Sequence, residues 1–468
     1  MSHPPQCDQI KPACTRCARL SIPCVGSGEQ RYKFKEHSLV LRHSKKREGE
    51  LAAVVFREPP SNQISRLAAE FVDLFKVDNL RYDISAYGPF FPQIPVRLGR
   101  SEAIDAATDA VCKTLHSYRS GVITQEALSS YVKALNALRA TLMDPAKAHS
   151  IDALLAIHMT MICQGWLHNR GSPTTNHGEG MAAIMAVTCK QGLLPILGYE
   201  ATYTITVTII IESITNRKIK LQPWLATVID QFADNRAFIS PCDEVIRLER
   251  IARIPDLLRD PIQHMHEHYE LFELTRRSFS ECHARLVKWS PILGTQGGVY
   301  RKHINQQRML LSLQTAYGIF LTMALVSGAF ITADGAGDAS VAADMARFHR
   351  EAIKLAHVAQ EHRPMGAAHL LVVLTAAWAS SEDLAQRDEI WALLQDYQAD
   401  FPHEKCLERC IWLRARIDSV YASKLLYLDQ YTNFAEADLL HDPSSHPPMA
   451  MSNLEVPSTE KEQLCVVM

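Results

Sequence analysis

The chain has 468 residues, of which 47% are hydrophobic and 21% are charged, and its formal net charge is −2. This length exceeds what one hydrophobic core usually supports, so we expect a small module beside a larger domain. The composition excludes a wholly disordered chain, and the first residues lack the apolar stretch of a secretory signal, which favours an intracellular protein.

A group of cysteines stands near the beginning of the chain with the spacing Cys-x6-Cys-x2-Cys-x6-Cys. Its members are Cys7, Cys14, Cys17 and Cys24. Thiolates bind zinc tetrahedrally, and a Cys-x2-Cys pair lets two sulfurs on one turn reach the same ion. In a reducing compartment, clustered cysteines are better explained as metal ligands than as disulfides. We therefore predict one zinc ion held by these four residues.

The same run resembles the second two-thirds of the zinc binuclear cluster of fungal transcription factors, a DNA-binding domain. As in that family, Asp8 follows the first of these cysteines, Pro12 lies in the connecting loop, and Pro23 precedes the last cysteine. The resemblance implies a zinc-dependent transcriptional regulator that acts on DNA in the nucleus. It also implies CGG-type target sites, contacts with the transcription machinery, and a chain that can form a homodimer.

The family's cluster begins with a further Cys-x2-Cys pair and a basic helix, and only six residues precede Cys7 here. In the family, that helix reads the base edges of the CGG triplet. Two explanations are open, of which we favour the first: the given chain lacks an upstream stretch, or it is a variant that keeps the regulator body without the reading helix.

Residues 1–47 contain ten Lys and Arg residues against three acidic ones, so this segment is locally basic. Such a segment suits contacts with phosphates better than base recognition. We assign the phosphate contacts to Lys11, Arg16, Arg19, Arg31 and Lys33. The run Lys45, Lys46 and Arg47 fits a nuclear import signal, and a solvated linker explains it equally well.

The chain is expected to contain four segments. They are a partial zinc cluster at 1–30, a basic linker at 31–62, a large helical regulatory domain at 63–440 and a disordered tail at 441–468. The stretch 131–187 also resembles, though with no sharp motif, the helical regulatory domain of many fungal regulators.

Apolar residues recur at helical spacing through the large domain, which predicts a mostly α fold. The clearest one-sided sets are Leu67, Phe71 and Leu74, followed by Val132, Leu135, Leu138 and Leu142. Residues 201–213 are rich in β-branched side chains, but their helical neighbours favour a buried helix over a strand. Met309–Ala333 carries no charge over roughly the length of a bilayer span. Its polar residues favour a helix buried in the domain, so we expect no membrane partner.

Two pairs of histidines raise the question of a metal or catalytic site. His264 and His268 lie one helical turn apart, but the zinc-protease pattern H-E-x-x-H fails because Glu270 stands at its second histidine. An exposed helix surface explains this motif better. His168 and His177 flank a predicted loop that carries no nucleophile pattern.

The rest of the chain contains no catalytic motif. The run DGAGDAS, residues 334–340, lacks the features of a phosphate loop and is interpreted as a helix-breaking loop. Isolated cysteines are expected to be small buried hydrophobes, and these are Cys112, Cys163, Cys189 and Cys242. We therefore expect no enzyme. The alternative function is a helical regulatory protein that does not bind DNA and acts through partner or small-molecule contacts.

The last four residues, CVVM from Cys465, fit the C-a-a-X prenylation pattern. The residues before them are not polybasic, and a single lipid gives only marginal membrane binding. The alternative is an unmodified end of the tail.

Overall fold

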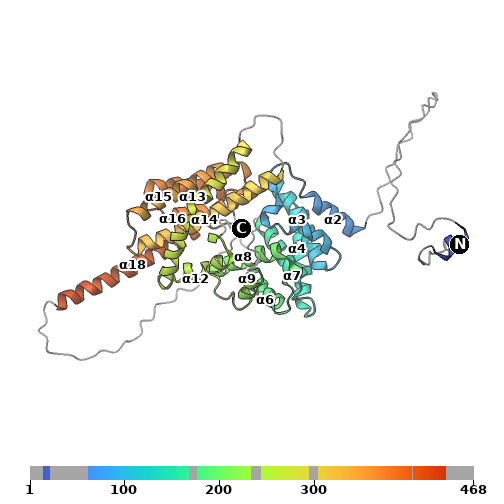
Figure 1. The fold of residues 1–468 in the computed structure, drawn as a ribbon, viewed down its shortest axis with the longest axis horizontal. Coiled ribbons are helices and arrows are strands. Elements are labelled where there is room, and N and C mark those ends of the chain that lie inside the picture. The colour runs from blue at the N-terminus through green and yellow to red at the C-terminus, as the bar shows by residue number, and fades with distance from the viewer. Residues whose placement is uncertain are drawn as a thin grey trace, which may run out of the picture. The chain divides into compact units, whose positions relative to one another are not determined.

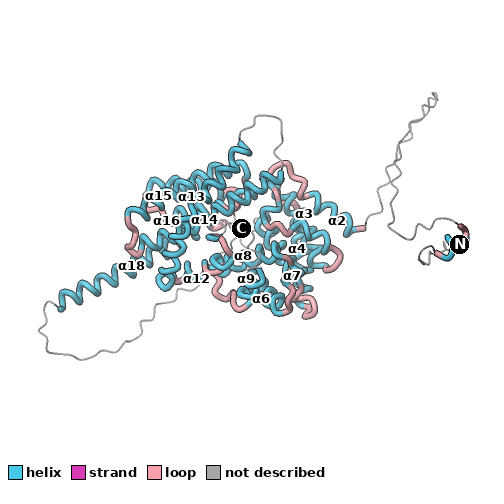
Figure 2. Tube along the Cα trace, viewed as in Figure 1, coloured by secondary structure: helices cyan, strands magenta, loops and turns pink. Residues whose placement is uncertain are grey.

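The computed structural model describes residues 14–21, 62–167, 177–232, 244–294, 304–402 and 404–438. The chain divides into two units, Met1–Pro59 and Pro60–Met468. Of the described residues, 81% are helical and none lies in a strand (Figure 2). The expected mostly α fold is confirmed for the larger unit, whereas only residues 14–21 of the smaller unit are described.

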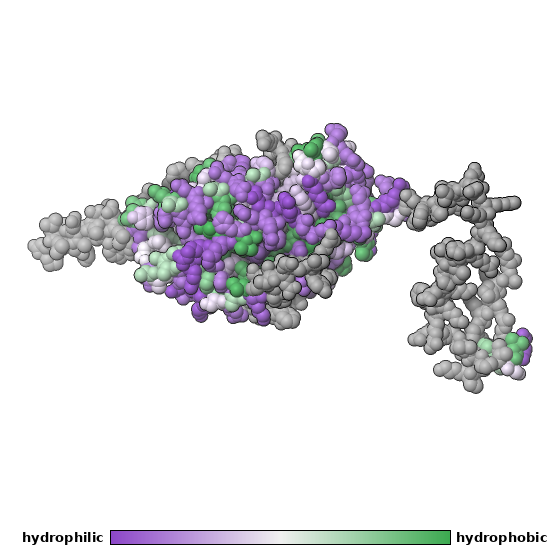
Figure 3. Space-filling view, turned by 90° about the horizontal axis from the view of Figure 1, so that it is seen from above, coloured by the Kyte–Doolittle hydropathy of each residue, from purple (hydrophilic) through white to green (hydrophobic). Residues whose placement is uncertain are grey.

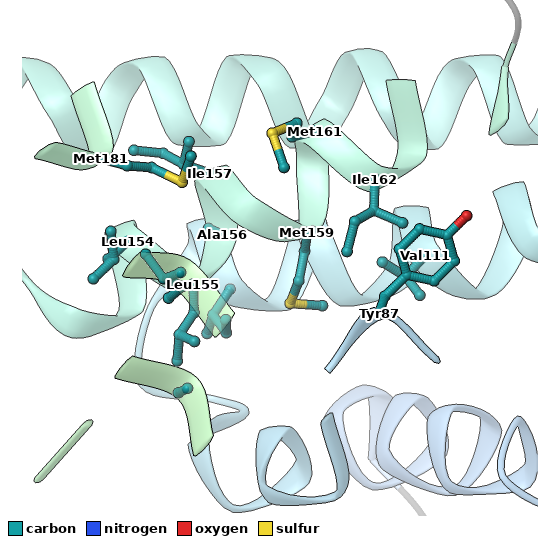
Figure 4. Packing of buried hydrophobic residues seen from close by; sticks show 14 of the residues in the cluster. Tyr87, Val111, Leu154, Leu155, Ala156, Ile157, Met159, Met161, Ile162 and Met181 are labelled. Atoms are coloured by element: carbon teal, nitrogen blue, oxygen red, sulfur yellow. The ribbon is translucent and has the colours of Figure 1, made fainter. Parts of the chain in front are cut away.

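The first half of the larger unit, blue to green in Figure 1, packs around one hydrophobic core. Its α-helices are α2 (Gln63–Asp73), α3 (Glu102–Ser120), α4 (Gln125–Met143), α5 (Ile151–Trp166), α6 (His177–Lys190), α7 (Leu194–Leu197), α8 (Tyr199–Thr215), α9 (Trp224–Phe232) and α11 (Leu248–Ile251). The 3-10 helices η1 (Leu80–Tyr82), η2 (Ile84–Tyr87) and η3 (Phe91–Arg97) join α2 to α3. Nearly every residue of α5 is buried, as expected of a helix that is apolar all round and lies inside the core. Its side chains pack among Tyr87, Val111 and Met181 (Figure 4).

The second half, yellow to red in Figure 1, builds a core of its own. Its elements are α12 (Ile254–Arg259), η4 (Pro261–His264), α13 (Met265–Gly294), α14 (Ile304–Ala333), α15 (Ala339–Ala359), η5 (Gln360–His362), η6 (Met365–Ala367), α16 (Leu370–Ser380), α17 (Leu384–Gln398) and α18 (Cys406–Asp438). α14 packs against α13, α15, α16 and α18 and is the central helix of this half. One outer face of the whole unit is mostly hydrophilic, with scattered hydrophobic patches (Figure 3).

α14 is long and apolar enough to cross a membrane, with a mean hydropathy of 1.7 in its most apolar stretch. However, 78% of that stretch is buried inside the protein. The hydroxyls of Thr322 and Thr332 donate to the carbonyls one turn earlier, at 3.0 and 2.8 Å, so these polar groups are satisfied within the helix. This is the packing of the core helix that the sequence predicted.

The β-branched stretch 201–213 lies within helix α8, as expected. Its intrinsic preference for a strand is overridden because Ile205, Ile209 and Ile210 are fully buried in the first core. The hydroxyls of Thr202 and Thr208 donate to carbonyls one turn earlier, at 2.7 and 3.0 Å. A threonine can make this bond only in a helix, so the hydroxyls do not oppose helix formation here.

The predicted apolar face of α4 is not the buried one. Of its four apolar residues only Leu138 is buried, while Val132, Leu135 and Leu142 are exposed. The buried face contains Tyr131 and Leu138 and otherwise consists of small residues, namely Ala127, Ser130, Ala134, Ala137 and Thr141. These small side chains allow α4 to lie close to α3, its main packing partner. On α2, by contrast, Leu67 and Phe71 are buried as predicted.

The two cores meet at an ion pair between η1–η2 and α14, in which the carboxylate is buried and the guanidinium is partly exposed. The side chain of Asp83 is 1% exposed, and its two oxygens accept Arg308 Nε at 2.6 Å and Nη2 at 3.2 Å. Arg308 Nη2 also donates to the Phe75 carbonyl at 3.4 Å. The same carboxylate accepts the backbone N–H of Ser85 at 3.1 Å and so caps η2.

A second polar connection lies nearby around Arg363. Its guanidinium donates to Asp400 Oδ2 at 2.6 Å and to Asp396 Oδ2 at 2.5 Å, and it lies over the ring of Tyr397. Its carbonyl accepts Arg81 Nε from the first half at 2.8 Å. The ion pairs fix Arg363 within the second half, and the hydrogen bond from Arg81 holds this segment against η1.

The segment after Arg363 enters the first core directly. Met365 is 3% exposed and belongs to the buried cluster of the first half. A Cβ atom on Gly366 would lie 3.1 Å from the Leu80 carbonyl and 2.9 Å from the Cβ of His362. The absence of a side chain at Gly366 thus permits the close approach of η6 to η1.

Replacing Arg308 should show how much the ion pair with Asp83 contributes to the stability of the fold. Arg308→Met leaves the Asp83 carboxylate buried without its cation, so we expect the free energy of unfolding to fall by about 3 kcal/mol. Asp83→Asn/Arg308→Met should be less destabilised than Arg308→Met alone, because the neutral amide can still accept the Ser85 N–H. Urea unfolding followed by circular dichroism measures both. Lys76→Met, which removes a largely exposed ion pair with Asp73, is the control and should change little. If Arg308→Met and Lys76→Met lowered the free energy of unfolding equally, the stabilising role of the Asp83–Arg308 pair would be contradicted.

Candidate metal centre

Cys14 and Cys17 lie on one helical turn in the smaller unit. Helix α1 (Thr15–Arg19) begins directly after Cys14, whose carbonyl accepts the Ala18 N–H at 3.0 Å. Ser21 ends the turn with a φ of 48°. Residues three apart on a helix share a face, so the turn places the two cysteines on the same side. Cys14 is 3% exposed and Cys17 is half-buried.

This turn supplies two of the four predicted zinc ligands. Cys7 and Cys24 lie outside the described residues. Within the described residues, no group of three or more His, Cys, Asp or Glu side chains could hold a metal ion. Cys14 and Cys17 can fill half of a tetrahedral shell, and the complete site stays a prediction.

Of the residues predicted to contact DNA, only those on α1 lie in the described part of the chain. Arg16 and Arg19 belong to this helix, and Arg19 is exposed beside the cysteine pair. An exposed guanidinium on a short helix suits contact with a phosphate. The predicted DNA-contact, import and lipidation residues outside the described part of the chain are Lys11, Arg31, Lys33, Lys45, Lys46, Arg47 and Cys465.

His264 and His268 do not form a chelating pair. His264 Nδ1 lies 2.9 Å from Glu267 Oε1, and the same carboxylate accepts Arg253 Nε and Nη2 at 2.9 and 2.8 Å. Hydrogen bonding to Arg253 holds the pKa of Glu267 at about 2, so the carboxylate is ionised and serves this ion pair. The site is structural and links the start of α12 to α13.

The prediction of an exposed surface is wrong for His268. This side chain is 1% exposed, with Nε2 at 3.3 Å from the Leu257 carbonyl and Nδ1 at 3.3 Å from Ser327 Oγ. Burial lowers its pKa to about 4, so the ring is neutral at physiological pH. The apolar surroundings come from a neighbouring helix, α14, whose Phe330 ring lies 4.6 Å away.

The buried carboxyl group of Glu212 on α8 was not predicted from the sequence. Glu212 Oε2 accepts the Gly178 N–H at 2.6 Å, which satisfies one of the first amides of α6. Burial raises the pKa of Glu212 from 4.5 to about 7. Next to Gly178, His177 Nε2 lies 2.9 Å from Gln164 Oε1, and burial lowers the pKa of His177 to about 4. The sequence signal for a buried carboxyl here is a charged residue that directly follows the three isoleucines 209–211.

Glu212 caps the start of α6. Its Oε2 is used by the α6 backbone, whereas its Oε1 is buried without a hydrogen-bond partner in the described part of the chain. His168 lies outside the described residues. The loop DGAGDAS separates α14 from α15, as predicted, and Asp338 caps α15 through the N–H groups of Ser340 and Val341.

The isolated cysteines behave mainly as small core residues. Cys112 and Cys163 are 3% and 0% exposed, which confirms the expectation, and burial raises the pKa of both thiols. Cys189 is half-buried, and its Sγ lies 3.6 Å from the Trp224 carbonyl. Cys242 lies outside the described residues.

Comparison with known proteins gives no family for this chain. No family model matches it, and no curated protein or solved structure is significantly similar to it.

The shifted pKa of Glu212 gives the folded protein a distinct pH dependence. Between pH 4.5 and 7 the folded chain binds this proton more tightly than the unfolded chain, so this group makes the free energy of unfolding fall as pH rises. Glu212→Gln keeps an acceptor for Gly178 and cannot ionise. As the pH rises from 4.5 to 8, we expect the free energy of unfolding of the variant to increase by about 2–3 kcal/mol relative to that of the parent protein.

Urea unfolding at several pH values tests this, because the buried histidines affect both proteins equally and cancel in the difference. Glu200→Gln, an exposed carboxylate on the same helix, is the control. A stability difference between Glu212→Gln and the parent that does not vary with pH would show that Glu212 is not held in its neutral form.

Proposed function

We propose that this protein is a zinc-dependent, DNA-binding transcriptional regulator that acts in the nucleus and is not an enzyme. The observation that carries the proposal is the spacing of Cys7, Cys14, Cys17 and Cys24, together with the prolines that accompany it. The turn at α1 supports it, because a Cys-x2-Cys pair on one face of a helix suits two ligands of one ion.

The zinc ion would have a structural role. Four thiolates fill a tetrahedral shell and leave no open position for a reacting water. Closing the shell would tie residues 7–24 into one folded loop, since metal binding and folding are coupled in such small modules. Arg16 and Arg19 would then be held on the same short helix as Cys17, directly after Cys14.

Binding to DNA would rest mainly on charge. The ten basic residues within 1–47 can displace counterions from phosphates, which gives an affinity that falls with salt and depends little on sequence. Preference for CGG sites needs donors aimed at guanine acceptors in the major groove. The helical body would act as the regulatory part and contact the transcription machinery.

Metal content provides the first test. We expect the purified chain to bind about one zinc ion, because four thiolates complete one shell. Cys14→Ser and Cys17→Ser should each lose most of this zinc, measured by elemental analysis. Cys189→Ser, in which the hydroxyl can keep the bond to Trp224, is the matched control and should retain it. A parent protein without zinc would contradict the metal site, and the regulator proposal would fail with it.

The salt dependence of DNA binding provides the second test. Fluorescence anisotropy should show affinity that falls steeply with salt and differs by less than about tenfold between CGG-containing and scrambled duplexes. Lys11→Ala/Arg19→Ala should reduce the slope of log K against log salt by about 2. Lys190→Ala/Lys218→Ala removes two exposed charges from the helical body and should leave the slope unchanged.

A chain extended upstream by a Cys-x2-Cys pair and a basic helix should hold a second zinc ion and prefer CGG. Zinc binding without any DNA binding would favour the alternative function, a helical regulatory protein that acts through partner or small-molecule contacts.

A further inference from the structure

Cys282 on α13 is disulfide-bonded. It is 2% exposed and ends a buried face of the helix that also carries Phe272, Thr275 and Phe279. The other cysteines that the structure describes form no disulfide, and they are Cys14, Cys17, Cys112, Cys163, Cys189, Cys406 and Cys410. The partner of Cys282 is therefore one of the cysteines outside the described residues, namely Cys7, Cys24, Cys242 and Cys465.

The position of Cys282 in the fold indicates which of the four is its partner. Cys282 and Val245 belong to the same buried cluster, the core of the second half. Cys242 precedes Val245 by three residues, which span about 10 Å when fully extended, and a disulfide joins Cα atoms about 4.4–6.8 Å apart. The other candidates lie in the smaller unit or in the tail beyond Asp438. Cys242 is thus the candidate that the chain keeps closest to this core.

A disulfide is unusual in a protein of a reducing compartment. The proposed function places this chain in the nucleus, where glutathione and thioredoxin keep most thiols reduced. Disulfides that form in such a compartment are mostly transient and redox-sensing, whereas structural ones are typical of secreted proteins. Cys163 and Cys410 are buried as completely as Cys282 and form no disulfide, so burial alone does not explain the bond. The Cys282 disulfide therefore has the features of a redox-sensing pair.

We propose that Cys282 and Cys242 form a redox-sensitive crosslink in the second half, in place of the small buried hydrophobe expected at Cys242. This inference rests on the proposed nuclear location. In reduction, the thiolate of glutathione attacks one sulfur of the pair, the S–S bond breaks, and a second glutathione resolves the mixed disulfide. Two electrons and two protons pass to the pair, which becomes two thiols, while the two glutathione molecules become one glutathione disulfide.

The crosslink would close the stretch of chain that connects the two halves. Between the two cysteines lie α11, α12 and η4, and both α11 and α12 pack on α8 of the first half. Closing this stretch onto α13 removes conformational freedom from the unfolded chain and so stabilises the folded protein. Reduction restores that freedom, so local opening of α11 and α12 should become more frequent.

Peptide mapping identifies the bond. The full chain is purified without reductant, its thiols are alkylated before digestion, and linked peptides are found by mass spectrometry. We expect a peptide pair that joins Cys242 to Cys282. An alkylated Cys282 would overturn the proposal, and a link from Cys282 to another cysteine would overturn the assignment of Cys242.

Thermal unfolding in glutathione mixtures tests the redox role. As the ratio of reduced to oxidised glutathione rises, the melting temperature of the parent protein should fall by at least about 3 °C. Cys282→Ala and Cys242→Ala should each melt at the same temperature in every mixture. Cys410→Ala, at a 0% exposed cysteine that forms no disulfide, is the matched control and should keep the response. A pair that stays oxidised in excess reduced glutathione would be a structural disulfide and would overturn the redox role.

Zinc content separates this inference from the proposed function. It should be about one ion per chain in the parent protein whether the Cys282 pair is oxidised or reduced, because Cys282 is not a predicted zinc ligand. Zinc without a response to glutathione would overturn the crosslink alone. A response to glutathione without zinc would overturn the metal site alone.

Discussion

Asp83 places a carboxylate at the boundary between the two helical cores, where it is out of contact with water. A buried charge of this kind is tolerated only beside a countercharge and hydrogen-bond donors, which Arg308 and the Ser85 amide provide. Because one side chain both caps η2 and binds α14, local structure and the docking of the two halves are fixed together. The Arg363 ion pairs and the insertion of Met365 into the first core depend on the same docking.

In three other buried ionisable groups of the helical body, desolvation shifts the pKa toward the neutral form. Glu212 has a raised pKa, and His177 and His268 have lowered ones. Each of them contacts a backbone or amide group, and these contacts account for its position through packing and capping. The chemistry that suggests a function lies instead in the cysteine spacing of the smaller unit.

The proposed zinc site rests on the smaller unit, whereas the larger unit leaves Val132, Leu135 and Leu142 of α4 exposed. Burial of Ala134 and Ala137 against the core is what turns the larger apolar side chains of α4 outward.

The sequence by itself determined the mostly α fold, the helical state of residues 201–213, the core position of α14 and the cysteine pattern. These depend on spacing along the chain, because helical periodicity and ligand spacing are local properties. Only the tertiary structure decided which face of α4 is buried and that His268 lies in the core. It alone showed that Asp83 meets Arg308, 225 residues away in the sequence. An apolar stripe fits a neighbouring helix of the same chain or a second molecule equally well, and a histidine is buried or exposed according to the helix packed over it. Those outcomes depend on the arrangement of distant elements, which short-range patterns do not encode.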